Sequence, residues 1–532
     1  MSFVPNPHQQ LSLDDSMSQL TDRELRFFNK SWGKYFGDYI FPQIDETPYA
    51  VLYSDVASRP NTPVNVQLGA LILKEYTGQS DDEIMESLMF DVRYQYALHT
   101  TSMTEQPLSD RTLSRFRERC ATYEAETGID LIHRTITEHA KQLEVLMKID
   151  PSLKRMDSMM VAANIKKMSR LELMYTVVAN LLKEMNVKGD EIPEEMTHYL
   201  NDDDRNLVIY HNRSEQTEDK INVVLNDAKK LKELCEPRYD ESSNYQLLVR
   251  ALREQTIEED GRLRLRTKED GGMGSDILQN PSDPEATYRS KNKKEHRGYV
   301  ANIVECAGEN GSIIEDYQYE PNNHSDSEFM KENLEAMGLQ ETPVTIVTDA
   351  AFGGEENQAL AKANNITLIT TNLTGKDTDE IMADFVLSED GTSVISCPYG
   401  QQPKSCSYNK KTETFYLSFT HSQCEGCPYR DRCKPTKHAK TYRRNFSQSM
   451  KQRALQKRAR QTDEFKKMSH FRNGVETVPS FMRRKYGVDH MPARGRIRGK
   501  MLFGLKIGAA NFAKFCKYLQ SLGSCAPVPA IG

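Results

Sequence analysis

The chain of 532 residues lacks the features that mark membrane-bound or disulfide-stabilised proteins. No run approaches eighteen consecutive apolar residues, which excludes an ordinary transmembrane helix. The first residues, MSFVPNPHQQLSLDDS, lack the basic and apolar regions of a signal peptide. Ten cysteines are too few for a disulfide scaffold in a chain of this length. We therefore expect a cytoplasmic protein of roughly two to four domains that has no contact with a membrane.

Acidic residues outnumber basic ones, giving a net charge of −7, but the two signs are spread unevenly. Between Lys434 and Lys517 there are 23 lysines and arginines against four acidic residues, a local balance of +19 that leaves −26 for the rest of the chain. A basic region of this size indicates contact with nucleic acid phosphates. The alternative is a solvated helical surface.

The N-terminal part predicts a small helical module. VQLGALILKEYTG, SDDEIMESLMF and LSDRTLSRFRERC have helical spacing of apolar residues, and the last two begin with capping residues. Short helices joined by tight turns are typical of a helix-turn-helix-like module, whose last helix would expose Arg115 and Arg119 to DNA. A helical bundle without DNA contact has the same pattern and stays open.

Strand patterns follow, and two of them carry acidic residues. LKRMDSMMVAANI reads as a buried strand around Asp157, and TPVTIVTDAAFGG reads as a strand that ends at Asp349. The helical pattern EENQALAKANN and the strand ITLITTN come next, which predicts parallel α/β geometry. Between the two acidic strands lie an acidic, mostly helical stretch over residues 166–280 and an expected hairpin, HRGYVANIVECA with GSIIEDYQYEP.

Asp157 poses a physical question, because a buried carboxylate is costly unless a positive charge lies beside it. Asp349 and Glu476, the latter in a predicted helix between Arg472 and Arg483, can complete a set of three carboxylates. Such a set can hold two Mg²⁺ or Mn²⁺ ions roughly 3.5–4 Å apart, as phosphodiester cleavage requires. Each residue has a structural alternative: a turn or cap for Asp157, an N-cap for Asp349, and an ion pair with Arg472 for Glu476.

Residues 388–440 have a different composition and predict a small zinc-ribbon-like insert. Four cysteines in this segment supply the thiolates that tetrahedral zinc prefers, and they include one C-x2-C knuckle: Cys397, Cys424, Cys427 and Cys433. Cys406 or His421 can substitute for one of them. A reduced cluster without metal is the alternative.

The order of these motifs resembles that of the DDE transposases of bacterial insertion sequences, which have a ribonuclease H-like catalytic core. The stretches that carry the resemblance are RMDSMMVAANIKK, YRSKNKKEHRGYVANIVE, YEPNNHSDSE, VTDAAFGGEEN and FRNGVETVPSFMRRKYG. The resemblance extends to the N-terminal helical module and to the cysteine-rich insert, and it covers roughly residues 30–520.

The resemblance implies an α/β (α+β) fold with a ribonuclease H-like core and these parts: an N-terminal helical DNA-binding domain (1–150), the first part of the core (151–387) with its helical insertion (166–280), the cysteine-rich insert (388–440), and a basic helical part with the catalytic Glu (441–532). It also implies that Asp157, Asp349 and Glu476 are the catalytic, metal-binding triad. Arg472, Glu476 and Arg483 follow the spacing of the family's Tyr-Arg-Glu-Lys signature. The chain departs from that signature at Ser469, where the family has Tyr, and at Arg483, where it has Lys.

The implied activity is that of a DNA transposase in the bacterial cytoplasm, associated with the nucleoid. It would bind the terminal inverted repeats of a mobile element and target DNA, cut and join strands, and act as a dimer or larger assembly on double-stranded DNA. The residues expected to contact DNA are Arg115, Arg119, Arg472, Arg483, Arg484, Lys485, Arg494, Arg496, Arg498 and Lys500. The alternatives are a stand-alone nuclease of the same fold and a DNA-binding protein that descends from a transposase but no longer uses the metals.

Overall fold

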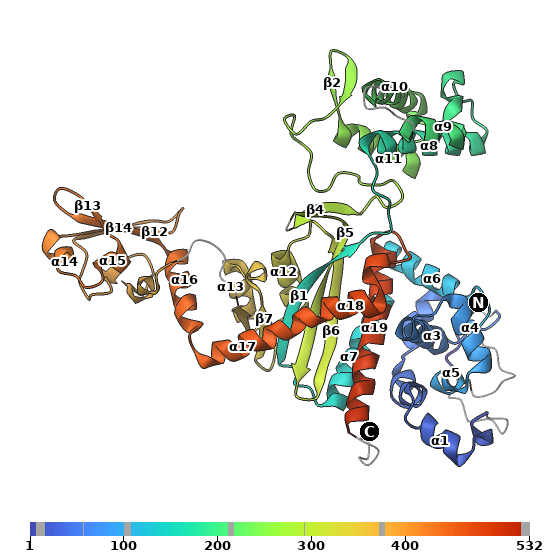
Figure 1. Cartoon of the computed structure of the whole chain (residues 1–532), viewed down its shortest axis with the longest axis horizontal. Helices are drawn as coiled ribbons and strands as arrows, with labels where there is room; N and C mark the ends of the chain where they lie inside the picture. Colours follow the sequence, from blue (N-terminus) through green and yellow to red (C-terminus); the bar gives the residue numbers. More distant parts are fainter. Residues whose placement is uncertain are drawn as a thin grey trace. The chain divides into compact units, whose positions relative to one another are not determined.

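The computed structural model describes residues 1–6, 16–56, 58–100, 108–210, 217–291, 293–371 and 378–522 (Figure 1). The chain divides into two compact units: the first is Met1–Pro151, Ser158–Phe329 and Val478–Gly532, and the second is Ser152–Asp157 and Met330–Thr477. Strand β1 (Leu153–Ala162) contributes to both units. None of the described helices combines the length and the apolar composition that a membrane crossing needs.

The first unit begins with helices that match the predicted helical module. They are α1 (Asp22–Phe28), α2 (Trp32–Tyr35), α3 (Val64–Thr77), α4 (Asp81–Phe90), α5 (Val92–Ala97), α6 (Thr112–Thr127) and α7 (Leu131–Met147). Capping boxes start two of them: Thr21 with Glu24 at α1, and Ser80 with Glu83 at α4.

The long helix α19 (Arg496–Ser521) forms the centre of the first unit (Figure 1). It is buried on most of its circumference, because its sequence is apolar on more than one face. It packs against α3, α7 and strand β6 (Gly311–Pro321). Residues from the two ends of the sequence therefore share one core, as shown by the edge-to-face contact between Phe36 and Phe512.

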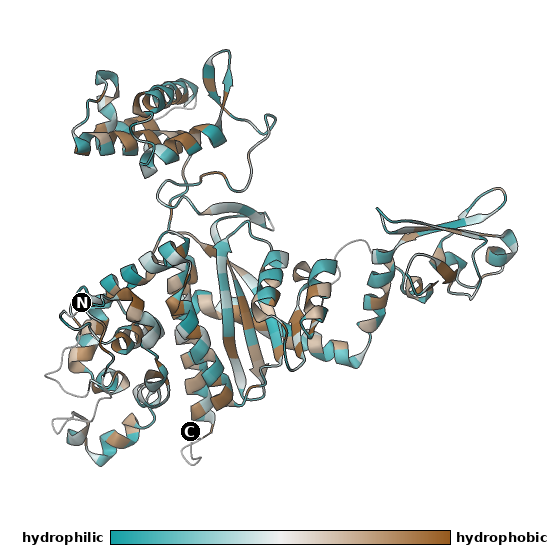
Figure 2. Ribbon diagram, turned by 180° about the vertical axis from the view of Figure 1, so that it is seen from behind, coloured by the Kyte–Doolittle hydropathy of each residue, from teal (hydrophilic) through white to brown (hydrophobic). Residues whose placement is uncertain are grey.

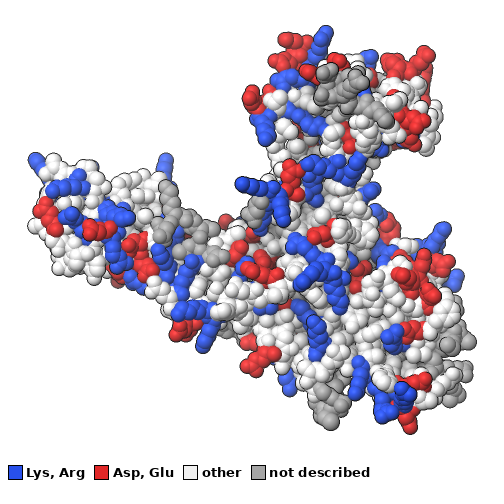
Figure 3. Space-filling view, in the orientation of Figure 1, with Lys and Arg blue, Asp and Glu red and all other residues white. Residues whose placement is uncertain are grey.

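The helical insertion has a hydrophobic core of its own. It consists of α8 (Arg170–Lys188), η5 (Glu194–Leu200), α9 (Asp202–Ile209), α10 (Thr217–Cys235) and α11 (Ser243–Gln255). Figure 2 shows apolar residues gathered on the inner sides of these helices. Figure 3 shows basic and acidic side chains intermingled on their outer surface, where ion pairs such as Lys183–Asp202 and Lys229–Glu258 form.

One element of the insertion differs from the helical pattern expected from YQLLVRALREQTIEED. The helix ends at Gln255, and the chain continues as the antiparallel hairpin β2 (Thr256–Glu259) and β3 (Arg262–Leu265). Its turn is formed by Asp260 and Gly261, both with positive φ. That conformation suits the right-handed twist of a two-residue hairpin.

The central sheet is mixed. Strands β4 (Thr287–Lys291), β5 (Lys294–Gly308) and β6 pair antiparallel, which confirms the expected hairpin. Strands β1, β7 (Val344–Thr348) and β8 (Ile366–Thr370) pair parallel, with α13 (Glu355–Ala363) connecting the last two, as predicted. The strand order is β4-β5-β1-β7-β8, with β6 on β5. Helix α12 (Asp326–Met337) lies between β6 and β7 in sequence.

The cysteine-rich segment folds around a four-stranded antiparallel sheet in the second unit. Its order is β11-β12-β14-β13, from Ser405–Asn409, Thr414–Phe419, Tyr442–Ser447 and Thr436–Lys437. Short elements complete it: η8 (Glu380–Asp384), β9 (Val386–Leu387), β10 (Val394–Ser396), α14 (His421–Glu425) and α15 (Arg430–Cys433). The chain then continues through α16 (Gln448–Ala459), α17 (Asp463–Asn473), η9 (Gly474–Glu476), α18 (Thr477–Tyr486) and η10 (Val488–His490).

Candidate active site

Asp157 and Asp349 are placed by two parallel strands. β1 pairs with β7 in the register Leu153↔Thr345 to Arg155↔Val347, and Asp349 directly follows the last residue of β7. Continuing that register brings Asp157 level with Asp349. Asp349 thus lies at the carboxyl end of β7, where ligand-binding side chains gather in parallel sheets, and Asp157 lies beside it in the middle of the longer strand β1.

Glu476 lies at a break between two helices. The sequence predicts it inside a helix, whereas the structure has a 3-10 turn over Gly474–Glu476, between α17 and α18. The exposed fraction of its side chain is 59%, against 18% for Asp157 and 32% for Asp349. All three residues, called the acidic cluster from here on, belong to the second unit.

Arg472 brings the acidic cluster together. Its guanidinium forms a hydrogen-bonded ion pair with Glu476 one turn later in the chain. Nη2 of the same side chain lies 3.6 Å from Oδ1 of Asp157 and 4.0 Å from Oδ2 of Asp349. The Arg472 side chain is only 9% exposed. Three carboxylates from distant parts of the chain thus converge on one buried cation, which answers the question posed by Asp157.

Arg155, which the sequence analysis did not single out, holds the helix that carries Arg472 against β1. Its Nη1 donates a hydrogen bond of 2.8 Å to the carbonyl of Phe471, and its guanidinium lies 5.2 Å from the centre of that residue's ring. A Cβ on Gly474 would lie 1.9 Å from Nη1 of Arg155, so this position of the guanidinium depends on the missing side chain of Gly474. The available signal was strand periodicity, because Arg155 and Asp157 are two residues apart and share a face of the strand.

The structural alternatives for the acidic cluster are present as contacts. Asp349 accepts a hydrogen bond of 2.8 Å from the backbone N–H of Ala351 and so caps the 3-10 turn η7 (Ala350–Phe352). Glu476 pairs with Arg472 at the expected spacing. Neither contact occupies both oxygens of the carboxylate, so both side chains keep an oxygen for a further ligand.

Several of the expected DNA-binding residues are engaged in ion pairs of the first unit. Lys500 pairs with Glu124 and Asp130 at 3.2 and 3.0 Å, and the side chains of both acidic partners are buried. Arg496 pairs with Glu285 and Glu320, and Arg498 donates two hydrogen bonds of 2.8 Å to Glu118. These pairs stabilise the surroundings of α19 and compete with phosphate for the same cations.

The remaining basic residues of the C-terminal region differ in their surroundings. Arg483 pairs with Asp489 at 3.2 Å and donates to the carbonyl of Met160, and Arg494 donates to the carbonyl of Asn164. The ammonium of Lys485 lies over the rings of Tyr76, Phe481 and Tyr486, and burial together with the charge of Lys517 lowers its pKa. Arg484 is exposed and bonds to the carbonyl of Ser480 within its own helix.

Arg115 and Arg119 line a cleft of about 320 Å³ in the first unit, together with Arg59. Arg119 also stacks on Tyr53, with 5.1 Å between its guanidinium carbon and the ring centre. Arg59 was not singled out from the sequence, because it lies in the irregular stretch SRPNTPVN, far from the helix that carries the other two.

The four predicted cysteines surround one small cavity. Cys397, Cys424, Cys427 and Cys433, called the cysteine cluster from here on, line a space of about 20 Å³. Burial and the neighbouring thiols raise the pKa of Cys424 to about 11, and burial raises that of Cys433 to about 11. The two candidate substitutes have other partners: Cys406 accepts a hydrogen bond from the N–H of Val394, and His421 contacts Glu425 and the carbonyl of His438.

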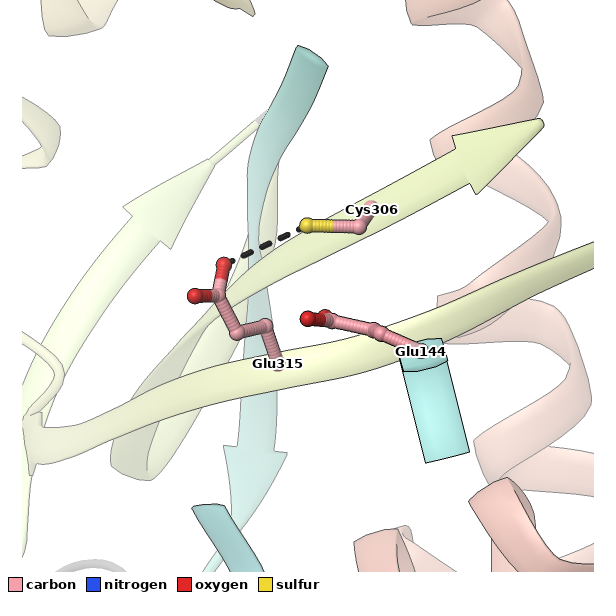
Figure 4. A group of neighbouring side chains, drawn as sticks. All are labelled: Glu144, Cys306 and Glu315. Atoms are coloured by element: carbon pink, nitrogen blue, oxygen red, sulfur yellow. Dashed lines mark hydrogen bonds between the residues drawn. The ribbon is translucent and has the colours of Figure 1, made fainter. Parts of the chain in front are cut away.

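A second group of potential metal ligands lies in the first unit, where the sequence analysis proposed none. Glu144 from α7, Cys306 from β5 and Glu315 from β6 have ligand atoms within 4.8 Å of one another (Figure 4). The thiol of Cys306 donates to Glu315 over 3.3 Å. Among the described residues, no other three such side chains have ligand atoms this close together, and this includes the acidic cluster and the cysteine cluster.

Comparisons with known proteins match two separate parts of the chain. A family described as "Transposase DDE domain" matches residues 396–516, which include the cysteine cluster, Arg472 and Glu476. A family described as "Transposase domain (DUF772)" matches residues 36–119, in the N-terminal helices. No curated protein matches the chain.

Among solved structures, a chain of the piggyBac transposase synaptic complex with hairpin DNA is similar to this chain at 10% sequence identity, over 95% of this chain and 77% of that one. The TM-score of 0.28 is too low for any conclusion about the fold. The assignment therefore comes from the two family matches, which agree with each other. The matches over residues 36–119 and 396–516 support a DNA transposase of the insertion-sequence DDE type, and enzymes with a DDE domain cleave and transfer DNA strands with divalent metal ions.

Proposed function

We propose that strand cleavage and strand joining both take place at the acidic cluster. The observation that carries this proposal is the convergence of Asp157, Asp349 and Glu476 on the guanidinium of Arg472. A set of carboxylates that converges on one cation has the chemistry to hold another, because oxygen ligands are what Mg²⁺ and Mn²⁺ prefer. The parallel strands that present the two aspartates support a ribonuclease H-like core.

Asp157, Asp349 and Glu476 would hold two divalent ions, which would activate the attacking water or 3′-hydroxyl and stabilise the leaving oxygen. The chain itself contributes the geometry. The register of β1 with β7 sets the two aspartates level with each other. The contact of Arg155 with Phe471 fixes the start of the turn that presents Glu476.

The DNA substrate would be the terminal inverted repeats of the element and, in the second step, target DNA. The 320 Å³ cleft with Arg59, Arg115 and Arg119 has the cations needed for phosphate contact by the N-terminal domain. Exposed Arg484 offers a further contact next to the acidic cluster in sequence. Joining two element ends requires two active sites, so we propose a dimer or larger assembly on DNA.

We also propose that the cysteine cluster holds a structural zinc ion. Four thiols around a cavity of about 20 Å³ match the ligand number and type of a closed tetrahedral site. A metal would explain why these half-buried thiols lie together at the edge of a small apolar core, to which structural zinc would add stability. The segments 1–150, 151–387, 388–440 and 441–532 remain our proposed domains.

The test is an assay of strand cleavage and joining on a labelled duplex that carries the element's own end, with Mg²⁺. We expect the wild type to cut the end and join it to target DNA. Asp157→Ala, Asp349→Ala and Glu476→Ala should lose both steps and keep DNA binding. Cleavage without joining in the wild type would indicate a nuclease, and full activity in any of the three variants would remove that residue from the site.

A further inference from the structure

Arg472 lies where a divalent ion would have to bind. The ion pair with Glu476 and the distances of 3.6 and 4.0 Å to Asp157 and Asp349 place one guanidinium between the three carboxylates. These carboxylates do not come within 4.8 Å of one another as a group. Ions of this kind bind carboxylate oxygens at about 2.0–2.6 Å, so a shared ion requires the carboxylates to close on the space that Arg472 uses.

The contacts of Arg472 favour displacement of its guanidinium by a metal ion. Only the contact with Glu476 is a hydrogen bond, and the two aspartates lie beyond hydrogen-bonding distance. Its Nε is buried and finds no hydrogen-bond acceptor among the described residues. A structural arginine in a buried site normally satisfies more of its five donors.

A cleft in the same unit lies along the face of the helix that carries Arg472. It has a volume of about 830 Å³ and is lined by Ala350, the neighbour of Asp349, and by Phe465 and Met468 of α17. Phe465, Met468 and Arg472 are spaced i, i+3, i+7 and so share a face of that helix. A rotation about the side-chain torsions of Arg472 can therefore point its head toward the cleft without moving the helix.

We propose that Arg472 and the divalent ions compete for the acidic cluster, so that metal binding releases Arg472 to contact the phosphate of a DNA strand in the cleft. This inference rests on the proposed role of the acidic cluster. It makes Arg472 a positioning residue that is coupled to the metal. The coupling is reciprocal: removing the guanidinium tightens metal binding, and binding metal exposes the guanidinium.

The first test measures Mn²⁺ binding by calorimetry in the absence of DNA, since Mn²⁺ prefers carboxylates over the thiols of the cysteine cluster. Arg472→Met should bind Mn²⁺ at least about tenfold more tightly, because a unit charge about 4 Å away no longer opposes the ion. Arg472→Lys, which keeps the charge, should stay close to the wild type. Lys466→Met is the matched control, because it removes one exposed cation from the same helix.

Unchanged or weaker Mn²⁺ binding by Arg472→Met would overturn the competition. Asp349→Asn separates this failure from a failure of the proposed site: it should lose Mn²⁺ binding if the acidic cluster holds metal, whatever Arg472 does. Arg472→Gln takes the place of the methionine variant if that variant does not fold.

The second test needs no variant. Phenylglyoxal modifies exposed arginines, and peptide mass spectrometry can follow single positions. Arg472 as a whole residue is 7% exposed and should react slowly, and Mn²⁺ should speed its modification several-fold. Arg155, 9% exposed and bound to Phe471, should react slowly with and without Mn²⁺. Equal rates for Arg472 in both conditions would contradict the proposal.

Discussion

The acidic cluster and the cysteine cluster are two sets of potential metal ligands in the same unit, and they are built in opposite ways. The cysteine cluster comes from one stretch of 37 residues, Cys397 to Cys433. The acidic cluster comes from three segments, with Asp157 more than 300 residues before Glu476. A local cluster can be stabilised by its own metal, whereas a dispersed one depends on the whole sheet and on a neutralising side chain.

The two clusters also differ in their need for a neighbouring positive charge. Burial raises the pKa of Cys424 and of Cys433, so without a metal these thiols would be neutral and would need no positive charge beside them. Three carboxylates cannot, and Arg472 supplies the positive charge. The acidic cluster is therefore the more sensitive of the two to changes in its surroundings.

The largest effect is expected at the acidic cluster itself. Glu476→Gln keeps the shape of the side chain and removes its charge. Cleavage of an element end should fall by about a thousandfold, since several kcal/mol of transition-state stabilisation depend on the bound ions. Single-turnover assays at saturating DNA would show this. A loss that higher DNA concentration restores would point to DNA binding and contradict the assignment.

A smaller effect should come from the contact that holds the acidic cluster together. In Gly474→Ala the new Cβ meets Nη1 of Arg155, so either the guanidinium leaves its place against Phe471 or the turn that presents Glu476 shifts. We expect cleavage to fall about ten- to a hundredfold, as for other displacements of about 1 Å at an active site. The control is Gly308→Ala, whose Cβ would meet no neighbour, and this variant should stay active. Gly487 does not serve as a control, because its φ of +58° disfavours alanine.

Substitution of a residue of the cysteine cluster should affect the stability of the protein first and its activity only as a consequence. Cys427→Ser should lower the zinc content from one ion per chain to near zero and lower the melting temperature, because structural zinc contributes to folding. Elemental analysis with thermal denaturation checks this. Cys406→Ser is the matched control, since Cys406 lies outside the cavity that the cluster lines. Equal loss of zinc in the control would mean that the cluster is assigned wrongly.

The smallest effect is expected at an exposed cation. Arg484→Gln should weaken DNA binding slightly and reduce the slope of log affinity against log salt by about 1, as for the loss of one phosphate contact. Lys500→Gln should instead leave the slope unchanged and destabilise the fold, because Lys500 neutralises the buried side chains of Glu124 and Asp130. The opposite pattern would show that Lys500 binds DNA.

Much of the fold could be predicted from local patterns. The β5–β6 hairpin and the β7–α13–β8 unit follow from alternation, turns and helical spacing, and the structure confirms both. The β2–β3 hairpin was missed, although Thr256 and Ile257 favour a strand and Asp260–Gly261 favours a tight hairpin turn. The preceding helical pattern of α11 concealed these signals.

The residues of the site could be predicted from the sequence, but the contacts between them could not. Asp157, Asp349 and Glu476 came from motif order, and the four cysteines from spacing. Arg472 was expected at DNA, because spacing along the chain cannot show that it meets Asp157, 315 residues away. The role of Arg155 depends on the same long-range contact between β1 and α17. Such contacts follow from sheet register and helix docking, which a single sequence does not specify.

The most direct test of the acidic cluster as the metal-binding site is a change of metal preference. A thiol ligand disfavours Mg²⁺ and tolerates Mn²⁺, so Asp349→Cys should lose strand cleavage in Mg²⁺ and regain a measurable part of it in Mn²⁺. Asp349→Ala should stay inactive with both ions. Cleavage by Asp349→Cys that is equal in the two metals, or absent in both while the wild type is active in both, would contradict metal binding by Asp349.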